Sequence, residues 1–290
     1  MFNGFDLSTI QDAKFGNSQV SSIYYGANLI WPTTPPPHDY SQDYLTFTVI
    51  SNTATFTFTK NTLQYSIDDG TTWTTLNANT ASPTINAGNK ILWKQTGLTP
   101  GTTNPGYGIG TFSATGYFNA SGNVMSLYYG DNFISQTNLT GKDYAFASLF
   151  YTCSYLASIE NLVLPATTLA SSCYSYMFAG CGRVTTAPEL TATILTNSCY
   201  YYMFANCFSL ENAPKLYAPI LVDRCYYSMF GSCRSLREIH CYAVDISAFN
   251  CTGDWVYDTY TGNGTFYKDA NTTWTTGNSG IPSGWTVINI

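Results

Sequence analysis

The chain has 290 residues, of which 10% are charged and 16% aromatic, and its formal net charge is −6. So many aromatic residues exclude a disordered chain, and the lack of a basic patch excludes nucleic-acid binding. No run of about 18 apolar residues is present, which excludes a transmembrane helix. The abundance of Thr and Tyr favours a mainly β fold.

Residues 1–31 are predicted to form a small docking segment. The stretch "VSSIYYGANLIW" alternates around a turn at Gly26–Asn28, a pattern that indicates a hairpin. A two-stranded hairpin is marginal alone in water, so we expect it to pack on another copy, a partner or the next domain. The stretch "PTTPPP" lies within residues 32–39 and predicts a semi-rigid linker.

Residues 40–141 are predicted to form an immunoglobulin-like β-sandwich. Short alternating segments such as "YLTFTVI", "ATFTFT", "LQYSI", "KILWKQT" and "MSLYYG" are separated by turn signals such as "DDG" and "NAGN". Many short strands at this spacing are typical of a sandwich or barrel.

Residues 142–250 contain four repeats. Cys181, Cys207 and Cys233 are 26 residues apart, and Cys153 precedes Cys181 by 28. A Phe stands three residues before each of these cysteines and a Leu or Val three residues after it. A fixed period of this kind predicts a solenoid. Residues 251–290, with the predicted strands "GTFYK", "TTWTT" and "SGWTVINI", are then expected to cap its open end.

The blocks "MFAGCGRV", "MFANCFSL" and "MFGSCRSL" resemble the BspA-type leucine-rich repeat. The longer, Tyr-rich form is similar to repeats of gut Bacteroidales and of their phages. The resemblance covers residues 142–250 well and the two ends of the chain more loosely. It implies a curved solenoid of strands and short helical turns, non-enzymatic, used for attachment or recognition.

The cysteines raise the questions of metal binding and disulfide formation. If Cys173–Cys181 is helical, its ends lie about 12 Å apart, too far for one zinc ion or one disulfide. Cysteines of neighbouring repeats could still pair if they lie on the strand side. We favour free thiols that pack as small apolar side chains, with no metal and no cofactor. The predicted core ladder comprises Cys153, Cys181, Cys207, Cys233, Phe150, Phe178, Phe204, Phe230, Cys173, Cys199 and Cys225.

Catalytic groups are sparse in the sequence. Asp254 and Asp258 are a conceivable glycosidase pair, but nothing distinguishes them from surface acids. The glycines from Gly106 to Gly110 are followed by a predicted strand, whereas a dinucleotide site needs a helix there. No catalytic residue is therefore predicted.

Tyrosines crowd the repeats, and flat rings with a polar tip suit contacts with sugars or proteins. The alternative is that their hydroxyl groups simply face water. The candidate binding surface consists of Tyr174, Tyr176, Tyr200, Tyr201, Tyr202, Tyr226 and Tyr227.

These observations predict a non-enzymatic attachment protein. The stretch "MFNGFDLSTIQDAKFG" does not resemble a signal peptide, so a virion-surface or fibre protein of a Bacteroidales phage, assembled in the host cytoplasm, is favoured. Its expected partners are another virion protein (or further copies of the chain) at residues 1–31 and a host-surface glycan or protein at the repeats. The alternatives are a bacterial cell-surface adhesin whose signal sequence was removed and, third, a glycan-active enzyme.

Overall fold

The structure is a computed structural model that describes residues 38–95, 108–259 and 262–290, together with four short strands before residue 38. The chain divides into two compact units, residues 1–39 and 40–290. Mainly β structure, in several separate sheets, makes up both units. No helix in the described part of the chain has the length and apolar character needed to cross a bilayer.

The first unit contains two antiparallel strand pairs. β1 (Ala13–Phe15) pairs with β2 (Ser18–Val20), and β3 (Ile23–Tyr25) pairs with β4 (Asn28–Trp31). The second pair covers the segment in which the sequence predicts a hairpin. Gly26 and Ala27 of the predicted turn, and residues 32–37 of the predicted linker, lie outside the described residues.

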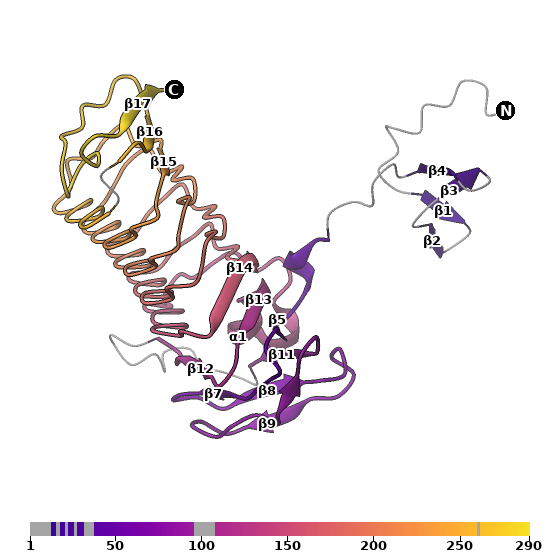
Figure 1. Ribbon diagram of the computed structural model, residues 1–290. Coiled ribbons are helices and arrows are strands. Elements are labelled where there is room, and N and C mark those ends of the chain that lie inside the picture. The colour runs from indigo at the N-terminus through magenta and orange to yellow at the C-terminus, as the bar shows by residue number, and fades with distance from the viewer. Residues whose placement is uncertain are drawn as a thin grey trace. The chain divides into compact units, whose positions relative to one another are not determined.

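The second unit begins with a six-stranded sheet in the order β14-β13-β5-β11-β8-β9 (Figure 1). Five strands are short segments of alternating or apolar sequence, and the sixth, β14, belongs to the first repeat. Their bounds are β5 (Leu45–Val49), β8 (Leu63–Ser66), β9 (Thr74–Leu76), β11 (Lys90–Lys94), β13 (Phe118–Asn123) and β14 (Leu156–Val163).

Two small strand pairs accompany this sheet, β6 (Thr53–Ala54) with β10 (Ile85–Asn86) and β7 (Phe56–Phe58) with β12 (Phe112–Ala114). An aromatic core joins the pairs to the sheet. The ring of Phe47, on β5, lies 4.8 Å from that of Phe112 and 5.1 Å from that of Phe56. These rings are inaccessible to solvent or nearly so, so this region folds around large interlocked side chains.

The stretch "MSLYYG", predicted as a strand, instead forms the short helix α1 (Ser126–Tyr129), which is followed directly by the 3-10 turn η3 (Gly130–Asn132). Another 3-10 turn, η2 (Tyr40–Gln42), lies at the start of the second unit. The side chain of Asn123 accepts a hydrogen bond from the amide of Met125 at 2.9 Å. Ser126 is buried and donates to the carbonyl of Trp93. The strand prediction was wrong because side-chain hydrogen bonds to the backbone here outweigh β propensity.

The sheet crosses the domain boundary predicted between residues 141 and 142. β13 lies before this boundary, β14 lies in the first repeat, and the two strands pair in parallel. One continuous hydrophobic core extends from β5 to the C-terminal part of the chain. The β-sheet region and the repeats are therefore packed together within one unit.

Successive repeats lie side by side as layers (Figure 1). Parallel bridges join Thr186 to Asn212 and Asn212 to Glu238, residues separated by one repeat length. Within residues 142–259, which the structure describes without a gap, the only strands are β14 and β15 (Glu238–Cys241), and no helix occurs. We call residues 142–259 the repeat stack.

The cysteine-flanked blocks of the stack form tandem turns rather than the predicted helical turns. Every fourth residue has a positive φ, as in Ser172 (54°), Tyr176 (56°) and Gly180 (81°). Between these residues, amides alternate between a carbonyl three residues earlier and a carbonyl of the next layer. The amide of Tyr174, for example, donates to the carbonyl of Cys199 at 3.0 Å. The hydrogen bonds between layers, absent from an isolated helix, therefore select this conformation.

The turn pattern continues into residues 251–258, which the sequence assigned to the cap. The amide of Tyr226 donates to the carbonyl of Cys251 at 2.9 Å, and Asp254 and Asp258 have positive φ. Cys251 thus belongs to a fifth layer. β15, in the fourth layer, pairs in parallel with β16 (Thr265–Lys268), and β16 pairs in parallel with β17 (Thr286–Asn289). The predicted strand "TTWTT" is irregular, and the ring of Trp274 packs on Trp255 at 5.4 Å.

Candidate binding surface on the repeats

Four of the seven candidate tyrosines form one half-buried cluster across three layers. We call this cluster, Tyr176, Tyr201, Tyr202 and Tyr227, the tyrosine strip. The rings of Tyr176 and Tyr202 stack at 4.9 Å, and those of Tyr201 and Tyr227 stack at 5.1 Å. Tyr201 and Tyr202 also touch, at 4.7 Å between ring centroids. The structure therefore brings these four predicted site residues together.

The faces of the strip's rings are largely occupied by protein. The ring of Tyr227 lies between Tyr201 and Gly253, where an added Cβ would come within 2.7 Å of the Tyr227 ring. Tyr202 lies between Tyr176 and Tyr227. A ligand on this surface would accordingly meet ring edges and hydroxyl groups, not open ring faces. A flat or elongated ligand rich in hydrogen-bonding groups suits such a surface.

The hydroxyl groups of Tyr176 and Tyr201 are neutral near pH 7, because the pKa of each lies above its usual value. Burial, the neighbouring tyrosines and a hydrogen bond to Tyr201 raise the pKa of Tyr176 well above its usual value. Burial and Tyr202 likewise raise the pKa of Tyr201, which the hydrogen bond from Tyr176 partly opposes. These hydroxyls can thus both donate and accept hydrogen bonds.

Two strip residues occupy a backbone conformation that does not favour tyrosine. Tyr176 and Tyr202 both have φ of 56°, in the left-handed region. The equivalent residues in the other layers are Ser148, Ser228 and Asp254. Left-handed backbone costs a non-glycine residue about 1–2 kcal/mol, and a bulky side chain there is unusual. The layer fold is therefore compatible with shorter residues at this position.

The other three candidate tyrosines belong to the core. Tyr174, Tyr200 and Tyr226 are at most 2% exposed and stack on one another at 5.9 and 6.0 Å. Their rings point inward because they lie two residues before the left-handed position of each turn, on the opposite side of the chain. They cannot contact a ligand at the surface, and their place in the predicted surface is corrected here.

All eleven residues of the predicted core ladder are buried, and all nine cysteines of the chain are free. The thiols of Cys181, Cys207 and Cys233 each donate to the carbonyl of a Phe in the preceding layer, at 3.0, 3.2 and 3.1 Å. Burial raises the pKa of Cys173 to about 12 and that of Cys207 well above its usual value. These thiols therefore link layers and stay protonated.

Two exposed tyrosines that the sequence did not single out lie at the first layer. Tyr151 is 46% exposed and its ring meets that of Tyr176 at 6.1 Å, while Tyr155 is 36% exposed and meets Tyr117 at 5.3 Å. Both pairs are edge-to-face, which leaves ring surface uncovered. The second, third and fourth layers have Ala179, Ala205 and Gly231 at the position of Tyr151, whereas the fifth has Tyr257, which is 55% exposed. This departure from the repeat was the signal available in the sequence.

Tyr151 and Tyr155 line a groove of about 300 Å³ against β12. β12 pairs with β7 on one edge, where Ser113 lies opposite Thr57. On its other edge, the amide of Phe112 donates to the carbonyl of Leu149 in the first layer at 2.8 Å. The groove is lined by hydroxyl-bearing and apolar residues, with no charged side chain among them. It continues the tyrosine strip at its N-terminal end.

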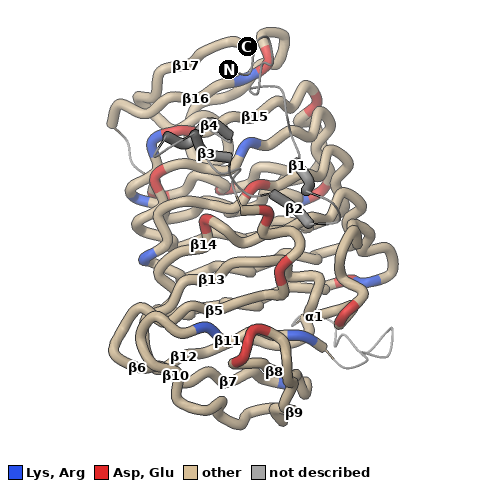
Figure 2. Tube along the Cα trace, turned by 90° about the vertical axis from the view of Figure 1, so that its right-hand side faces the viewer, with Lys and Arg blue, Asp and Glu red and all other residues tan. Residues whose placement is uncertain are grey.

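Charged residues are spread thinly over the second unit (Figure 2). Asp258 forms an ion pair with Arg234 at 2.7 Å, and this contact lowers the pKa of its carboxyl group. His240 is hydrogen-bonded to Glu238 and stacks on Tyr267 at 3.9 Å. In the described ranges no three His, Cys, Asp or Glu side chains are grouped as for a metal ion.

No protein-family model, curated protein or solved structure matches this chain. The resemblance to BspA-type repeats therefore stays a prediction from the sequence.

Proposed function

We propose that this chain is a non-enzymatic recognition protein that binds an uncharged surface, a glycan or a protein, through the tyrosine strip and the adjoining groove. The observation that carries the proposal is the left-handed backbone of Tyr176 and Tyr202. Other layers accommodate Ser or Asp at this position, so tyrosine is not required for the turn. Left-handed residues occur in every layer, so the sign of function is the choice of a tyrosine here, where a shorter side chain suffices.

The groove supports the same proposal. Tyr151 and Tyr155 offer partly uncovered ring surface beside the hydroxyl groups of the strip. Apolar ring surface combined with neutral hydroxyl groups matches the alternating C–H and O–H surface of a sugar. Since charged groups are absent from the groove lining, a neutral glycan fits it better than an ionic ligand.

We extend the proposal to the fold of the two regions. We take the repeat stack to be a solenoid of the leucine-rich-repeat kind, capped by β16 and β17, which extend the sheet that begins with β15. The parallel bridges between residues one repeat apart support this assignment. The preceding region would be the immunoglobulin-like sandwich.

The biological setting follows from the resemblance. A virion-surface or fibre protein of a Bacteroidales phage would display the strip toward the host, while residues 1–31 would hold another virion protein. A bacterial adhesin would use the same surface.

The proposal is tested by binding to Bacteroidales cells and to a glycan array. Tyr202→Asn, which retains a residue that tolerates the left-handed backbone, should reduce binding at least tenfold. The matched control is Tyr217→Ala, because Tyr217 is 42% exposed outside the strip. Unchanged binding by Tyr202→Asn and Tyr151→Ala together would overturn the proposed surface. Glycan turnover that is lost in Asp254→Asn would replace binding by catalysis.

A further inference from the structure

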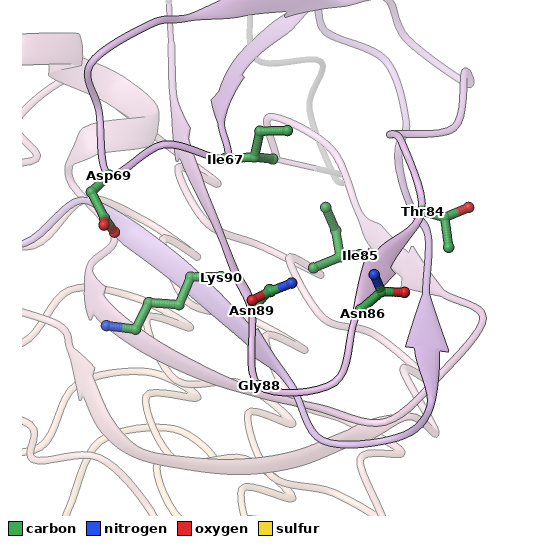
Figure 3. A pocket seen from close by; sticks show the side chains of 8 residues that line it. All are labelled: Ile67, Asp69, Thr84, Ile85, Asn86, Gly88, Asn89 and Lys90. Carbon is green, nitrogen blue, oxygen red and sulfur yellow. The ribbon is translucent and has the colours of Figure 1, made fainter.

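We propose that a second site, in the β-sheet region and outside the tyrosine strip, binds one neutral saccharide unit. A cavity of about 440 Å³ lies between the turn after β8 and the segment β10 to β11 (Figure 3). Its volume is within the range of small-molecule sites. It shares no residue with the strip or with the groove beside β12, so it goes beyond the proposed function.

The turn after β8 carries two carboxylates, one that is hydrogen-bonded within the turn and one that lines the cavity. Asp68 accepts hydrogen bonds from the amide and hydroxyl of Thr72 and from the hydroxyl of Ser66. These bonds lower the pKa of Asp68 to about 2. Asp69, in contrast, lines the cavity and forms no side-chain hydrogen bond or ion pair with any residue that the structure describes. Its carboxylate is thus available to accept hydrogen bonds from a ligand.

The segment from β10 to β11 supplies both donors and acceptors. Asn86, Asn89 and Lys90 are exposed at the cavity, and among the described residues none of their side chains has a hydrogen-bond or ion-pair partner. An Asn amide both donates and accepts, and a Lys ammonium group only donates. Vicinal hydroxyl groups of a sugar, which also donate and accept, match this combination.

The charges of the cavity compensate one another. Asp69 and Lys90 lie on the same side of the hollow, across from Asn86 (Figure 3). One carboxylate and one ammonium group give the lining no net charge, so neither a free anion nor a free cation is favoured. A neutral polyhydroxylated ligand meets no uncompensated charge there.

Two isoleucines provide an apolar part. Ile67 and Ile85 line the cavity beside these polar groups (Figure 3). Ile67 is 57% exposed, whereas Ile85 is 4% exposed and anchored in the core. A site that combines apolar contact with a few convergent polar groups is the usual composition of a ligand pocket, and C–H groups of a pyranose ring would cover Ile67.

Strands and hydrogen-bonded turns hold the polar groups of the cavity in place. Asn86 belongs to β10 and Lys90 to β11. The amide of Gly88 donates to the carbonyl of Val49 at 2.8 Å, and its φ of 81° forms the turn between the two strands. The turn that carries Asp69 is closed by the Asp68 hydrogen bonds. Such preorganisation lowers the entropic cost of binding.

The test is a titration of the full 15N-labelled chain with glucose, galactose, mannose, fucose and N-acetylglucosamine, one at a time. At least one sugar should shift the side-chain amide signals of Asn86 and Asn89. Asn89→Ala should then weaken this sugar's affinity at least tenfold, and Asp69→Asn, which tolerates the same left-handed backbone, several-fold. The control is Lys215→Met, which removes an exposed charge from the repeat stack and should leave the affinity unchanged.

The outcomes separate this site from the proposed function. Tyr202→Asn should leave these titrations unaltered, whereas Asn89→Ala should leave binding by the tyrosine strip unaltered. The proposal is overturned if none of the sugars moves the two Asn signals, or if Asn89→Ala binds as tightly as the unaltered chain. The free amino acid glycine and inorganic phosphate are titrated in the same way. Shifts of the two Asn signals with only one of these compounds would also overturn the proposal, because they would indicate an ionic ligand.

Discussion

The β-sheet region (residues 40–141) and the repeat stack (residues 142–259) share one hydrophobic core but build it differently. In the sheet region Phe47 contacts five other aromatic rings from different elements, among them Trp93 and Phe118. In the stack each ring meets its equivalents in the adjacent layers, as Phe178 meets Phe150 and Phe204 at 5.7 and 5.4 Å. A defect should therefore spread widely in the first region and stay local in the second.

The two regions meet in one column of rings. Phe112 of the sheet region stacks on Phe150 at 5.8 Å, and Phe150 begins the series that continues through Phe178 to Phe230. The sheet region thus covers the first face of the stack, which an isolated repeat array would leave open. The stability of the stack should therefore depend on the sheet region more than the stability of the sheet region depends on the stack.

The largest effect is expected from Phe47→Ala. Removal of a fully buried Phe costs about 3–5 kcal/mol of unfolding free energy, and this ring, on the six-stranded sheet, touches Phe112 of the β7–β12 pair and Phe150 of the first layer. Chemical denaturation should show the loss, and hydrogen exchange should quicken in β5 and in the first layers together. Phe208→Ala, at a 46% exposed ring, is the matched control. Faster exchange confined to residues 45–123 would show that the regions are energetically independent.

Cys207→Ala should have a smaller and more local effect. It removes the hydrogen bond from the Cys207 thiol to the carbonyl of Phe178 and leaves a small cavity, which together cost about 1–2 kcal/mol. Hydrogen exchange should quicken in the layers on either side and stay unchanged in β5. The control is Ser154→Ala, in a polar position at the surface. Equal acceleration in β5 would contradict the local character of the stack.

The sequence identified residues that stack between repeats but not the backbone conformation of the segments that carry them. The recurrence of Cys and Phe every 26 residues identified the residues that pack between layers, because equivalent positions in a repeat meet one another. It did not reveal that every fourth residue is left-handed, since Ser172, Tyr176 and Gly180 share no local propensity. The turns are selected by hydrogen bonds between layers, which lie far apart along the chain.

Only part of the candidate site was predicted correctly, because the backbone conformation of the repeats was not predicted. A helical interpretation could not distinguish Tyr174, which points inward, from Tyr176, which lies at the surface. The sequence held a usable signal, because Tyr recurs in all three blocks at the position of Tyr174 but gives way to Ser228 at the position of Tyr176. The cavity beside Asp69 depends on how β8, β10 and β11 meet in space, and no local pattern indicates that.

The pH dependence of stability should separate the sheet region from the stack. Asp131 accepts hydrogen bonds from Lys94 at 2.6 Å and from Tyr44 at 2.7 Å, and these contacts lower the pKa of its carboxyl group. The stabilisation is present above the unfolded pKa of about 3.9 and is lost as the pH falls below it. Burial and Asp131 raise the pKa of Tyr44 to about 12. That contribution is present below pH 10 and is lost as the pH rises toward 12.

Each of these contributions should be under about 1 kcal/mol, because the carboxyl group is largely exposed and solvent screens it. Asp131→Asn should flatten the acid change of the denaturation midpoint and reduce the alkaline change only slightly, because burial also raises the pKa of Tyr44 and of stack thiols such as Cys173. Asp143→Asn provides the control at an acid in the first layers. The interpretation fails if Asp131→Asn retains the full pH dependence.

The smallest change in stability is expected from Tyr202→Asn, at the surface where binding is proposed. The substitution relieves about 1 kcal/mol of left-handed strain and removes ring contacts worth about 0.5–1.5 kcal/mol, so the two terms nearly cancel. The free energy of unfolding should stay within about 0.5 kcal/mol of that of the unaltered chain, while binding falls. Tyr200→Asn, at the buried neighbour, should instead destabilise the stack severely. If Tyr202→Asn were equally destabilising, the strip would be a packing element, and its left-handed tyrosines would no longer indicate a ligand.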